Sequence, residues 1–133
     1  MCVFCKIVNG EIPAYKVYED EDFLAFLDIA QASVGHTLVV PKKHFSNFLE
    51  ADEETISKLF VLAAKLAKQI TQNLEVAGFN ILNNNGTVAG QSVNHLHVHI
   101  LPRYEHDSIT IKFAQNHLSE SEMQALIARI SHK

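Results

Sequence analysis

The 133-residue chain has few cysteines, no excess of basic residues and no long apolar run. Its two cysteines, Cys2 and Cys5, are too few and too close together for a disulfide framework, which draws on cysteines along a whole chain. The formal net charge of −4 offers no basic field to nucleic acid or an anionic membrane. No apolar run approaches the roughly 20 residues of a transmembrane helix, and no secretory signal pattern is visible. These absences predict a cytoplasmic protein that binds neither nucleic acid nor membrane.

What is present is ordinary for a globular protein, with 47% hydrophobic and 20% charged residues. No repeat, low-complexity tract or linker interrupts the sequence, so we expect one domain over residues 1–133. Histidine is the exception, because eight histidines are many for a chain of this length.

Short runs of β-branched, aliphatic and aromatic residues between turn residues predict five strands. The expected strands are Ala14–Tyr18, Phe23–Asp28, Thr37–Val40, Phe79–Leu82 and Leu96–Leu101, the last ended by Pro102. Apolar residues at helical spacing follow the N-cap Asp52 and predict a long helix ending near Leu74. One helical turn is expected at Cys5–Val8, and the capping box Ser119–Glu122 predicts a short C-terminal helix. Because the strands follow one another without regular helical crossovers, we expect an α+β fold with an antiparallel sheet.

Three histidines, His95, His97 and His99, alternate with Leu96 and Val98. Alternate side chains of a strand share one face, so neighbouring rings would lie roughly 6.5 Å apart. Three interpretations follow: a polar face without function, a site that only holds metal, or nucleophilic catalysis. In the last, one neutral imidazole attacks phosphorus while another assists by hydrogen bonding or proton transfer.

The polar loop directly before these histidines, residues 83–92, favours the catalytic interpretation. Gly90 lets backbone approach a phosphate closely. Gln91, Ser92 and backbone N–H groups are suited to holding oxyanions. Placed next to a histidine strand, the loop reads as a cradle for phosphate.

The segment Gly90–Leu101, GQSVNHLHVHIL, resembles the signature of the histidine triad (HIT) family. Leu38–His44 is similar to the family's third-strand segment, and Phe26–Ile29 to the segment that holds the nucleoside. The resemblance covers residues 2–103. It implies a five-stranded antiparallel sheet with one long helix, and a homodimer with a continuous ten-stranded sheet. It also implies hydrolysis or transfer of nucleoside monophosphate groups through a covalent nucleotidyl-histidine.

The resemblance also implies roles for individual residues. His97 is the implied nucleophile, His99 contacts the phosphate and assists the leaving group, and Ser92 lies near the leaving-group atom. The other implied nucleotide contacts are Asn84, Gly90 and Gln91 on the phosphate side, Asp28 at the ribose hydroxyls, and Leu27 and Ile29 beside the base.

The pair Cys2-x-x-Cys5 has three interpretations: a redox pair, two unpaired thiols, or half of a zinc site. The N-terminus lacks the strand–helix setting of a thioredoxin-like redox motif. Many bacterial-type HIT proteins, which this chain resembles, hold zinc with such a pair, the histidine after the third strand and the first triad histidine. The matching residues are Cys2, Cys5, His44 and His95. Four protein ligands leave no open position on the metal, so we expect a structural zinc.

The leading functional hypothesis is a hydrolase of the purine nucleoside phosphoramidase type. The close alternative is a dinucleoside polyphosphate hydrolase, which shares the mechanism and which Leu101-Pro102-Arg103 resembles, whereas Ser92 and the cysteine pair favour the phosphoramidase. Two alternatives of other classes are a nucleotide-binding sensor or scaffold with little turnover and a zinc-dependent regulatory domain. An intact triad argues against a binding module, since binding alone would not need His97.

We expect no functional role for the remaining histidines or for a pair of lysines. We expect His36 at the surface or in a turn, because it directly precedes a strand. His106, His117 and His132 lie in polar segments and are expected to be solvated. Lys42 and Lys43 could attract phosphate, but such a pair is more often a solvated face.

Overall fold

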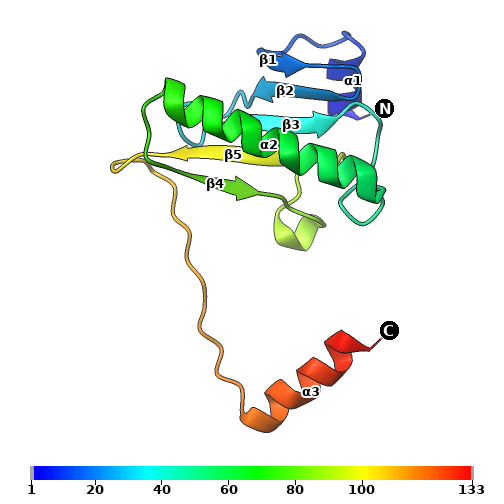
Figure 1. Cartoon of the computed structure of the whole chain (residues 1–133), viewed down its shortest axis with the longest axis vertical. Coiled ribbons are helices and arrows are strands. Elements are labelled where there is room, and N and C mark those ends of the chain that lie inside the picture. Colours follow the sequence, from blue (N-terminus) through cyan, green and yellow to red (C-terminus); the bar gives the residue numbers. More distant parts are fainter. Residues whose placement is uncertain (1, 133) are drawn as a thin grey trace.

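A computed structural model describes residues 2–132 as a five-stranded sheet with helices on both faces (Figure 1). The sheet order is β1-β2-β3-β5-β4, and all neighbouring strands are antiparallel. The strands are β1 (Lys16–Glu19), β2 (Phe23–Leu27), β3 (Thr37–Pro41), β4 (Gly78–Leu82) and β5 (Val98–Arg103). The helices are α1 (Val3–Val8), α2 (Glu53–Asn73), the short 3-10 helix η1 (Thr87–Ala89) and α3 (Glu120–Ser131). The expected α+β fold is confirmed.

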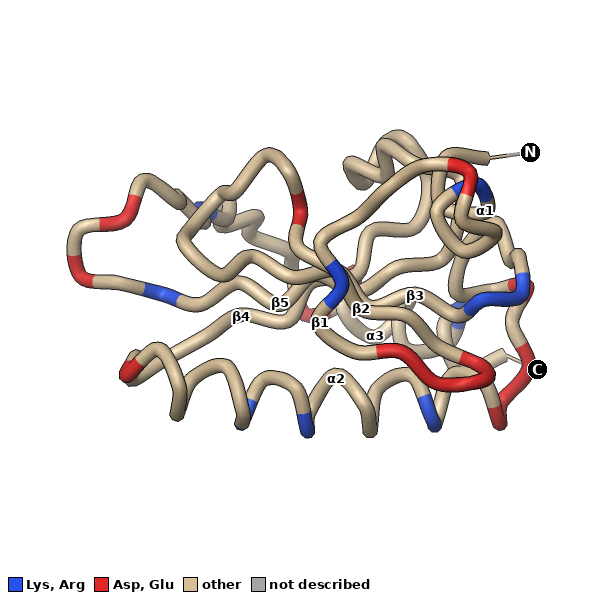
Figure 2. Tube along the Cα trace, turned by 90° about the horizontal axis from the view of Figure 1, so that it is seen from above, with Lys and Arg blue, Asp and Glu red and all other residues tan. Residues whose placement is uncertain are grey.

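The long helix α2 covers one face of the sheet (Figure 1). Asp52 begins it as expected, because its carboxylate accepts a hydrogen bond from the Thr55 N–H at 3.0 Å. Leu59, Ala63 and Leu66 are buried at three- and four-residue steps. They pack in one cluster with inward residues of β2, β3 and β5. The outer side of α2 carries basic residues, while acidic residues gather at the turn between β1 and β2 (Figure 2).

The opposite face of the sheet holds a second apolar cluster that includes the short helix α1. Phe4 and Ile7 of α1 are buried against Phe26 and Leu38. Strands β2 and β3 are therefore buried on both faces, which explains why their sequences are almost continuously apolar. Helix α1 is thereby packed beside the histidine segment that leads into β5.

Strand β5 differs from the expected strand at both ends. It begins at Val98 rather than Leu96, so only His99 of the three histidines lies within it. The residues before it bond elsewhere: the Leu96 N–H donates to the Phe45 carbonyl at 2.7 Å, outside the β3 ladder. The expectation that Pro102 ends the strand is also wrong. Pairing with β3 stops at Ile100, so Pro102 lies where β5 is bonded only to β4 and a missing N–H is tolerated.

Other boundaries moved by one or two residues. The first strand begins at Lys16 rather than Ala14 and continues to Glu19, and α1 begins at Val3 rather than Cys5. After β5 the chain leaves the sheet as an extended segment and ends in α3, whose capping box at Ser119 and Glu122 is confirmed (Figure 1). Among residues 2–132, no helix is long and apolar enough to cross a membrane.

Candidate active site

A cavity of about 310 Å³ opens on the α1 side of the sheet. Six residues of the predicted nucleotide site line it together: Leu27, Asp28, Ile29, Ser92, His97 and His99. Phe4 and Leu38 form part of an apolar wall. The structure therefore brings the end of β2, the beginning of β5 and the loop before the histidines around one hollow.

His97 is 3% exposed and is held in one tautomer. Its Nδ1 lies 2.7 Å from the carbonyl oxygen of His95. A carbonyl only accepts, so Nδ1 carries the hydrogen and Nε2 carries the lone pair. Burial lowers the pKa of His97, which the hydrogen bond to the carbonyl partly offsets. The ring is thus a neutral imidazole with a nucleophilic Nε2.

His99 receives the opposite tautomer through a chain of hydrogen bonds. The Ala32 N–H donates to His36 Nδ1 at 3.2 Å, so the hydrogen of His36 is on Nε2. His36 Nε2 lies 2.9 Å from His99 Nδ1 and donates to it. His99 therefore carries its own hydrogen on Nε2. Because the rings of His97 and His99 are 4.9 Å apart, a lone pair and an N–H donor are available side by side.

Burial lowers the pKa of His99 from 6.5 to about 4, and the repulsion that protonated His97 and His36 would exert acts in the same direction. Burial also lowers the pKa of His36, against the opposing effect of Asp28. Both rings are consequently neutral near pH 7, as the chain of hydrogen bonds requires. His36 Nε2 is also 3.6 Å from an oxygen of Asp28, whose other oxygen accepts from the Ala30 N–H at 2.8 Å.

The expectation for His36 was wrong, because it is a buried member of the site and only 5% exposed. The register of β3 with β5 pairs Leu38 with His99. His36 precedes Leu38 by two residues and shares its face, so it lies diagonally beside His99. The sequence does contain a signal, because His36 alternates with the residues of the following strand that face inward. This signal points to the site only when the pairing of β3 with β5 is known.

A second cluster consists of Cys2, Cys5, His44 and His95, whose ligand atoms all lie within 4.8 Å of one another. The cysteine sulfurs are 3.3–3.6 Å from the Nδ1 atoms of the two histidines, and these nitrogens are 3.2 Å apart. For a tetrahedral zinc the corresponding separations are roughly 3.6 and 3.3 Å. His95 Nε2 donates to the Pro41 carbonyl at 2.8 Å, which leaves its Nδ1 lone pair facing the sulfurs. These four residues lie close enough to bind a metal ion.

The ring of Phe4 connects this cluster to the cavity. It packs edge-on against His95 and His97, with ring centroids 5.9 and 5.1 Å apart, and against Phe26 at 5.4 Å. Phe4 lies between Cys2 and Cys5 in the chain. The cysteine helix α1 is therefore both a wall of the cavity and the carrier of two potential metal ligands.

The loop before the histidines is held mainly by its own side chains. The Gln91 amide accepts from the Gly86 N–H at 2.8 Å and donates to the Ser46 carbonyl at 2.6 Å, and the Gln91 N–H donates to the Gly86 carbonyl. Asn84 Nδ2 lies 3.4 Å from the Gly90 carbonyl, and Gly90 has a φ of 94°. Asn84, Gly90 and Gln91 do not line the cavity, whereas Ser92 does.

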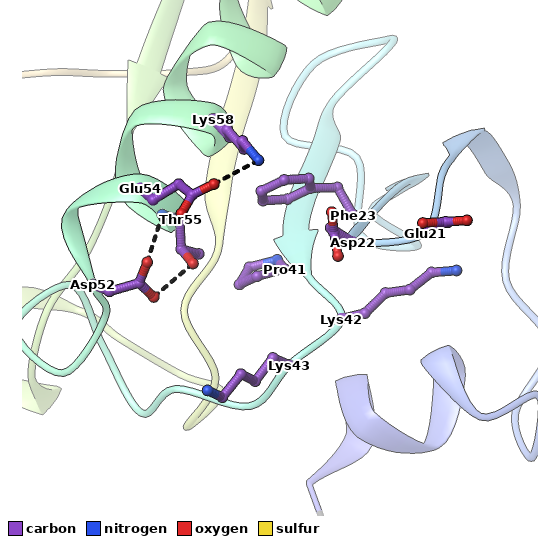
Figure 3. A pocket seen from close by; sticks show the side chains of 10 residues that line it. All are labelled: Glu21, Asp22, Phe23, Pro41, Lys42, Lys43, Asp52, Glu54, Thr55 and Lys58. Carbon is purple, nitrogen blue, oxygen red and sulfur yellow. Dashed lines mark hydrogen bonds and ion pairs between the residues drawn. The ribbon is translucent and has the colours of Figure 1, made fainter.

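A separate hollow of about 310 Å³ lies at the start of α2 and contains Lys42 and Lys43 (Figure 3). Its charges are largely paired: Lys58 with Glu54 at 2.9 Å, and Lys42 with Glu19 at 2.8 Å. The lysine pair therefore does not belong to the histidine cavity. His106, His117 and His132 are exposed, as expected.

The fold and the histidine segment define a histidine triad domain. The chain belongs to the HIT family, because the HIT domain matches residues 9–106. A HIT-like protein of Methanocaldococcus jannaschii is 54% identical over 115 residues, which cover 86% of this chain and 88% of that protein. Adenosine 5'-monophosphoramidase hnt1 of Schizosaccharomyces pombe is 39% identical over 133 residues, covering 99% and 97%. A crystal structure from Streptococcus mutans superimposes with a TM-score of 0.93 at 47% identity, covering 97% of this chain and 82% of that one.

Proposed function

We propose that this protein hydrolyses purine nucleoside phosphoramidates through a covalent intermediate on His97. The observation that carries the proposal is the pair of opposite tautomers, with a lone pair on His97 Nε2 and a hydrogen on His99 Nε2. Catalysis of this kind needs a nucleophile and a proton donor beside one phosphate. A protein that only bound nucleotides would not need the lone pair fixed toward the cavity.

The reaction proceeds in two steps. His97 Nε2 attacks the α-phosphorus, and as the N–P bond to the ring forms, the bond from phosphorus to the leaving amine breaks. As it leaves, the amine takes up one proton at the position that His99 Nε2–H faces, and the proton is drawn from solvent so that His99 stays neutral. Water then attacks the same phosphorus and gives up one proton, which replaces the one consumed in the first step. The bond from phosphorus to His97 breaks, the nucleoside monophosphate leaves, and the neutral imidazole of His97 is regenerated.

The remaining lining residues fit the nucleoside and phosphate portions of such a substrate. Leu27, Asp28 and Ile29 line the cavity at the end of β2. We assign the Asp28 carboxylate to the ribose hydroxyls, and Leu27 and Ile29 to the two sides of the base. Ser92 lines the same cavity, and we assign it to the leaving-group side of the phosphate. We assign Asn84 and Gly90 to the phosphate side through the loop backbone, and Gln91 to holding that loop in shape.

The S. pombe relative named as an adenosine 5'-monophosphoramidase matches nearly the whole chain, which favours this substrate class over dinucleoside polyphosphates. In the segment that suggested the alternative, Leu101-Pro102-Arg103, the charged residue Arg103 donates to Asp107 at 2.8 Å and to Asn80 at 2.7 Å. It does not line the cavity. A substrate role for Arg103 would require these bonds to break.

We further propose that Cys2, Cys5, His44 and His95 hold a structural zinc. Their distances fit a tetrahedral ion, and the set leaves no position for a reacting water. The ion would supply a cross-link between α1 and the segment that carries the histidines. The four residues bind it, and no step of the hydrolysis passes through them.

A homodimer through β4, with a continuous ten-stranded sheet, completes the proposal. Strand β4 is one of the two edges of the sheet, and its Phe79, Ile81 and Leu82 are 44%, 38% and 43% exposed. The other edge, β1, carries an ion pair between Lys16 and Glu19, a charged edge of the kind that opposes pairing. An apolar, unpaired edge is the one suited to a second copy. The cytoplasmic location stays a prediction.

The decisive experiment compares hydrolysis of an adenosine phosphoramidate with that of a diadenosine polyphosphate. We expect the phosphoramidate to be the better substrate and a mass increase of one nucleotidyl group on the protein during turnover. His97→Ala should abolish both turnover and adduct, whereas His106→Ala, at an exposed histidine, should change neither. Absence of turnover of both substrates would refute the enzyme, and an adduct surviving in His97→Ala would place the nucleophile elsewhere.

A further inference from the structure

The loop between β2 and β3, residues 28–36, carries groups that the proposed reaction uses at both of its ends. Asp28 stands at its first position and lines the cavity. His36 stands at its last position and donates to His99. The Ala32 N–H lies between them in sequence and donates to His36 Nδ1 at 3.2 Å. The shape of this loop therefore places the carboxylate assigned to the ribose and also the histidine that faces His99.

The side chain of Gln31 joins the two ends of this loop. Its amide nitrogen donates to the Asp28 carbonyl at 2.5 Å and to the His36 carbonyl at 2.8 Å. Its amide oxygen accepts from the Gly35 N–H at 2.8 Å and from the His36 N–H at 3.1 Å. Two carbonyls and two N–H groups admit only this orientation of the amide. Both of its N–H donors and both lone pairs of its oxygen are therefore used within the loop.

Gln31 acts on the site from outside the cavity. It does not line the histidine cavity, and its side chain lines a separate hollow beside the C-terminal end of α2. Gly35, which has a φ of 97°, lines the same hollow, and a Cβ there would lie 2.6 Å from the Leu74 side chain. The loop is thus packed against α2 on one side and bonded internally by Gln31. No substrate in the cavity would touch this amide.

We propose that Gln31 is a positioning residue that sets the tautomers of His36 and His99 by holding the Ala32 N–H against the His36 ring. The proposal rests on the hydrolysis proposed above. Gln31 bonds both backbone groups of His36 and directly precedes Ala32, so it fixes the distance between that N–H and the ring. The Ala32 N–H keeps the hydrogen of His36 on Nε2, and that hydrogen keeps the hydrogen of His99 on its own Nε2.

The loop has other bonds that close it, which separates this role from general stability. The Asp28 N–H donates to the His36 carbonyl at 3.0 Å, and the His36 N–H donates to the Ser33 carbonyl at 3.0 Å. These bonds keep the loop folded when the Gln31 amide is removed, but neither of them reaches Ala32. Because Gln31 is also exposed, we expect its replacement to leave the fold intact and to release the Ala32 N–H from His36.

Release of the Ala32 N–H changes the proton positions inside the cavity. His36 Nδ1 is then free to carry the hydrogen, and the lone pair left on Nε2 faces the lone pair of His99 Nδ1 over 2.9 Å. The repulsion is relieved when the hydrogen of His99 moves from Nε2 to Nδ1. The N–H that faces the leaving group is thereby lost in a fraction of the molecules.

The test replaces Gln31 with methionine, which keeps the side-chain length and removes every hydrogen bond of the amide. Nitrogen NMR shifts without substrate should show the hydrogen on Nε2 of His36 and His99 in wild type and mixed tautomers in Gln31→Met. In phosphoramidate hydrolysis, kcat should fall about three- to tenfold, because a hydrogen bond is weakened rather than deleted, and KM should change less. Gln69→Met makes the same substitution at an exposed glutamine of α2 in the same hollow and should leave shifts and kcat unchanged.

Two more variants show whether the effect passes through the donors of the amide and through His36. Gln31→Glu keeps acceptor oxygens but lacks the two N–H donors, and it should shift the tautomers in the same direction. The double variant Gln31→Met/His36→Met should match the kcat of His36→Met within about twofold, because residues acting in one series are not additive.

The outcomes separate the role of Gln31 from the proposed reaction. Unchanged tautomers in folded Gln31→Met and Gln31→Glu, or losses that multiply in the double variant, would overturn the positioning role and leave the hydrolysis standing. A wild-type protein without turnover would overturn the hydrolysis, whereas the NMR shifts would still decide whether Gln31 sets the tautomers.

Discussion

His36 donates a hydrogen bond to His99 without lining the cavity, so its replacement gives a specific kinetic prediction for the proposed reaction. His36→Met puts an apolar side chain of comparable length in place of the imidazole and removes the N–H that donates to His99 Nδ1 over 2.9 Å. The nitrogen of His99 is then buried without its donor, and the ring no longer favours the tautomer with hydrogen on Nε2. A fraction of the molecules then lacks the hydrogen on His99 Nε2 that faces the leaving group.

The expected magnitude follows from the worth of one such bond. A buried group left without its hydrogen-bond partner costs about 1–3 kcal/mol, and a change of tautomer recovers part of it. We therefore expect about 1–2 kcal/mol at the transition state, which is a loss of roughly 5- to 30-fold in kcat. KM should change little, because His36 does not line the cavity.

The assay is steady-state hydrolysis of an adenosine phosphoramidate by wild type, His36→Met and His36→Gln. Glutamine places an amide N–H near the position of the imidazole Nε2, so it should recover kcat to within about threefold. Nitrogen NMR shifts of His99 report its tautomer directly, and zinc content should be equal in all three proteins. Equal kcat in wild type and His36→Met, or an equal loss in both variants, would refute the role of this N–H.

Two further predictions concern the metal cluster and pH. Wild type purified without chelator should contain one zinc per chain, and metal-free wild type would contradict the site. Cys5→Ser should lose the zinc and have a lower Tm. Lys6→Ala, on the exposed side of α1, should retain the zinc. Because burial lowers the pKa of His99 from 6.5 to about 4, the unfolded chain binds a proton there first as pH falls. The free energy of unfolding should therefore fall by up to about 3 kcal/mol as the pH is lowered from 6.5 to 4. In urea unfolding of His99→Gln at the same pH values, this contribution to the fall should be missing.

The local signals in the sequence predicted most of the secondary structure. The N-cap Asp52 and the capping box at Ser119 fixed where two helices begin, because caps act within one turn of chain. Strand ends were less accurate. The bonds of Leu96 to Phe45, and the end of β3 pairing at Ile100, involve residues distant in sequence, so the limits of β5 were misplaced.

The sequence by itself determined that three alternating histidines follow a polar loop and that two cysteines lie near the N-terminus. It could not show that His36 reaches His99, because that contact depends on the register of β3 against β5. Nor could it show that the tautomer of His99 is set through His36 by the Ala32 N–H. Residue types and short-range spacing are written in the chain, whereas tautomers and buried partners are set by atoms that only the folded sheet brings together.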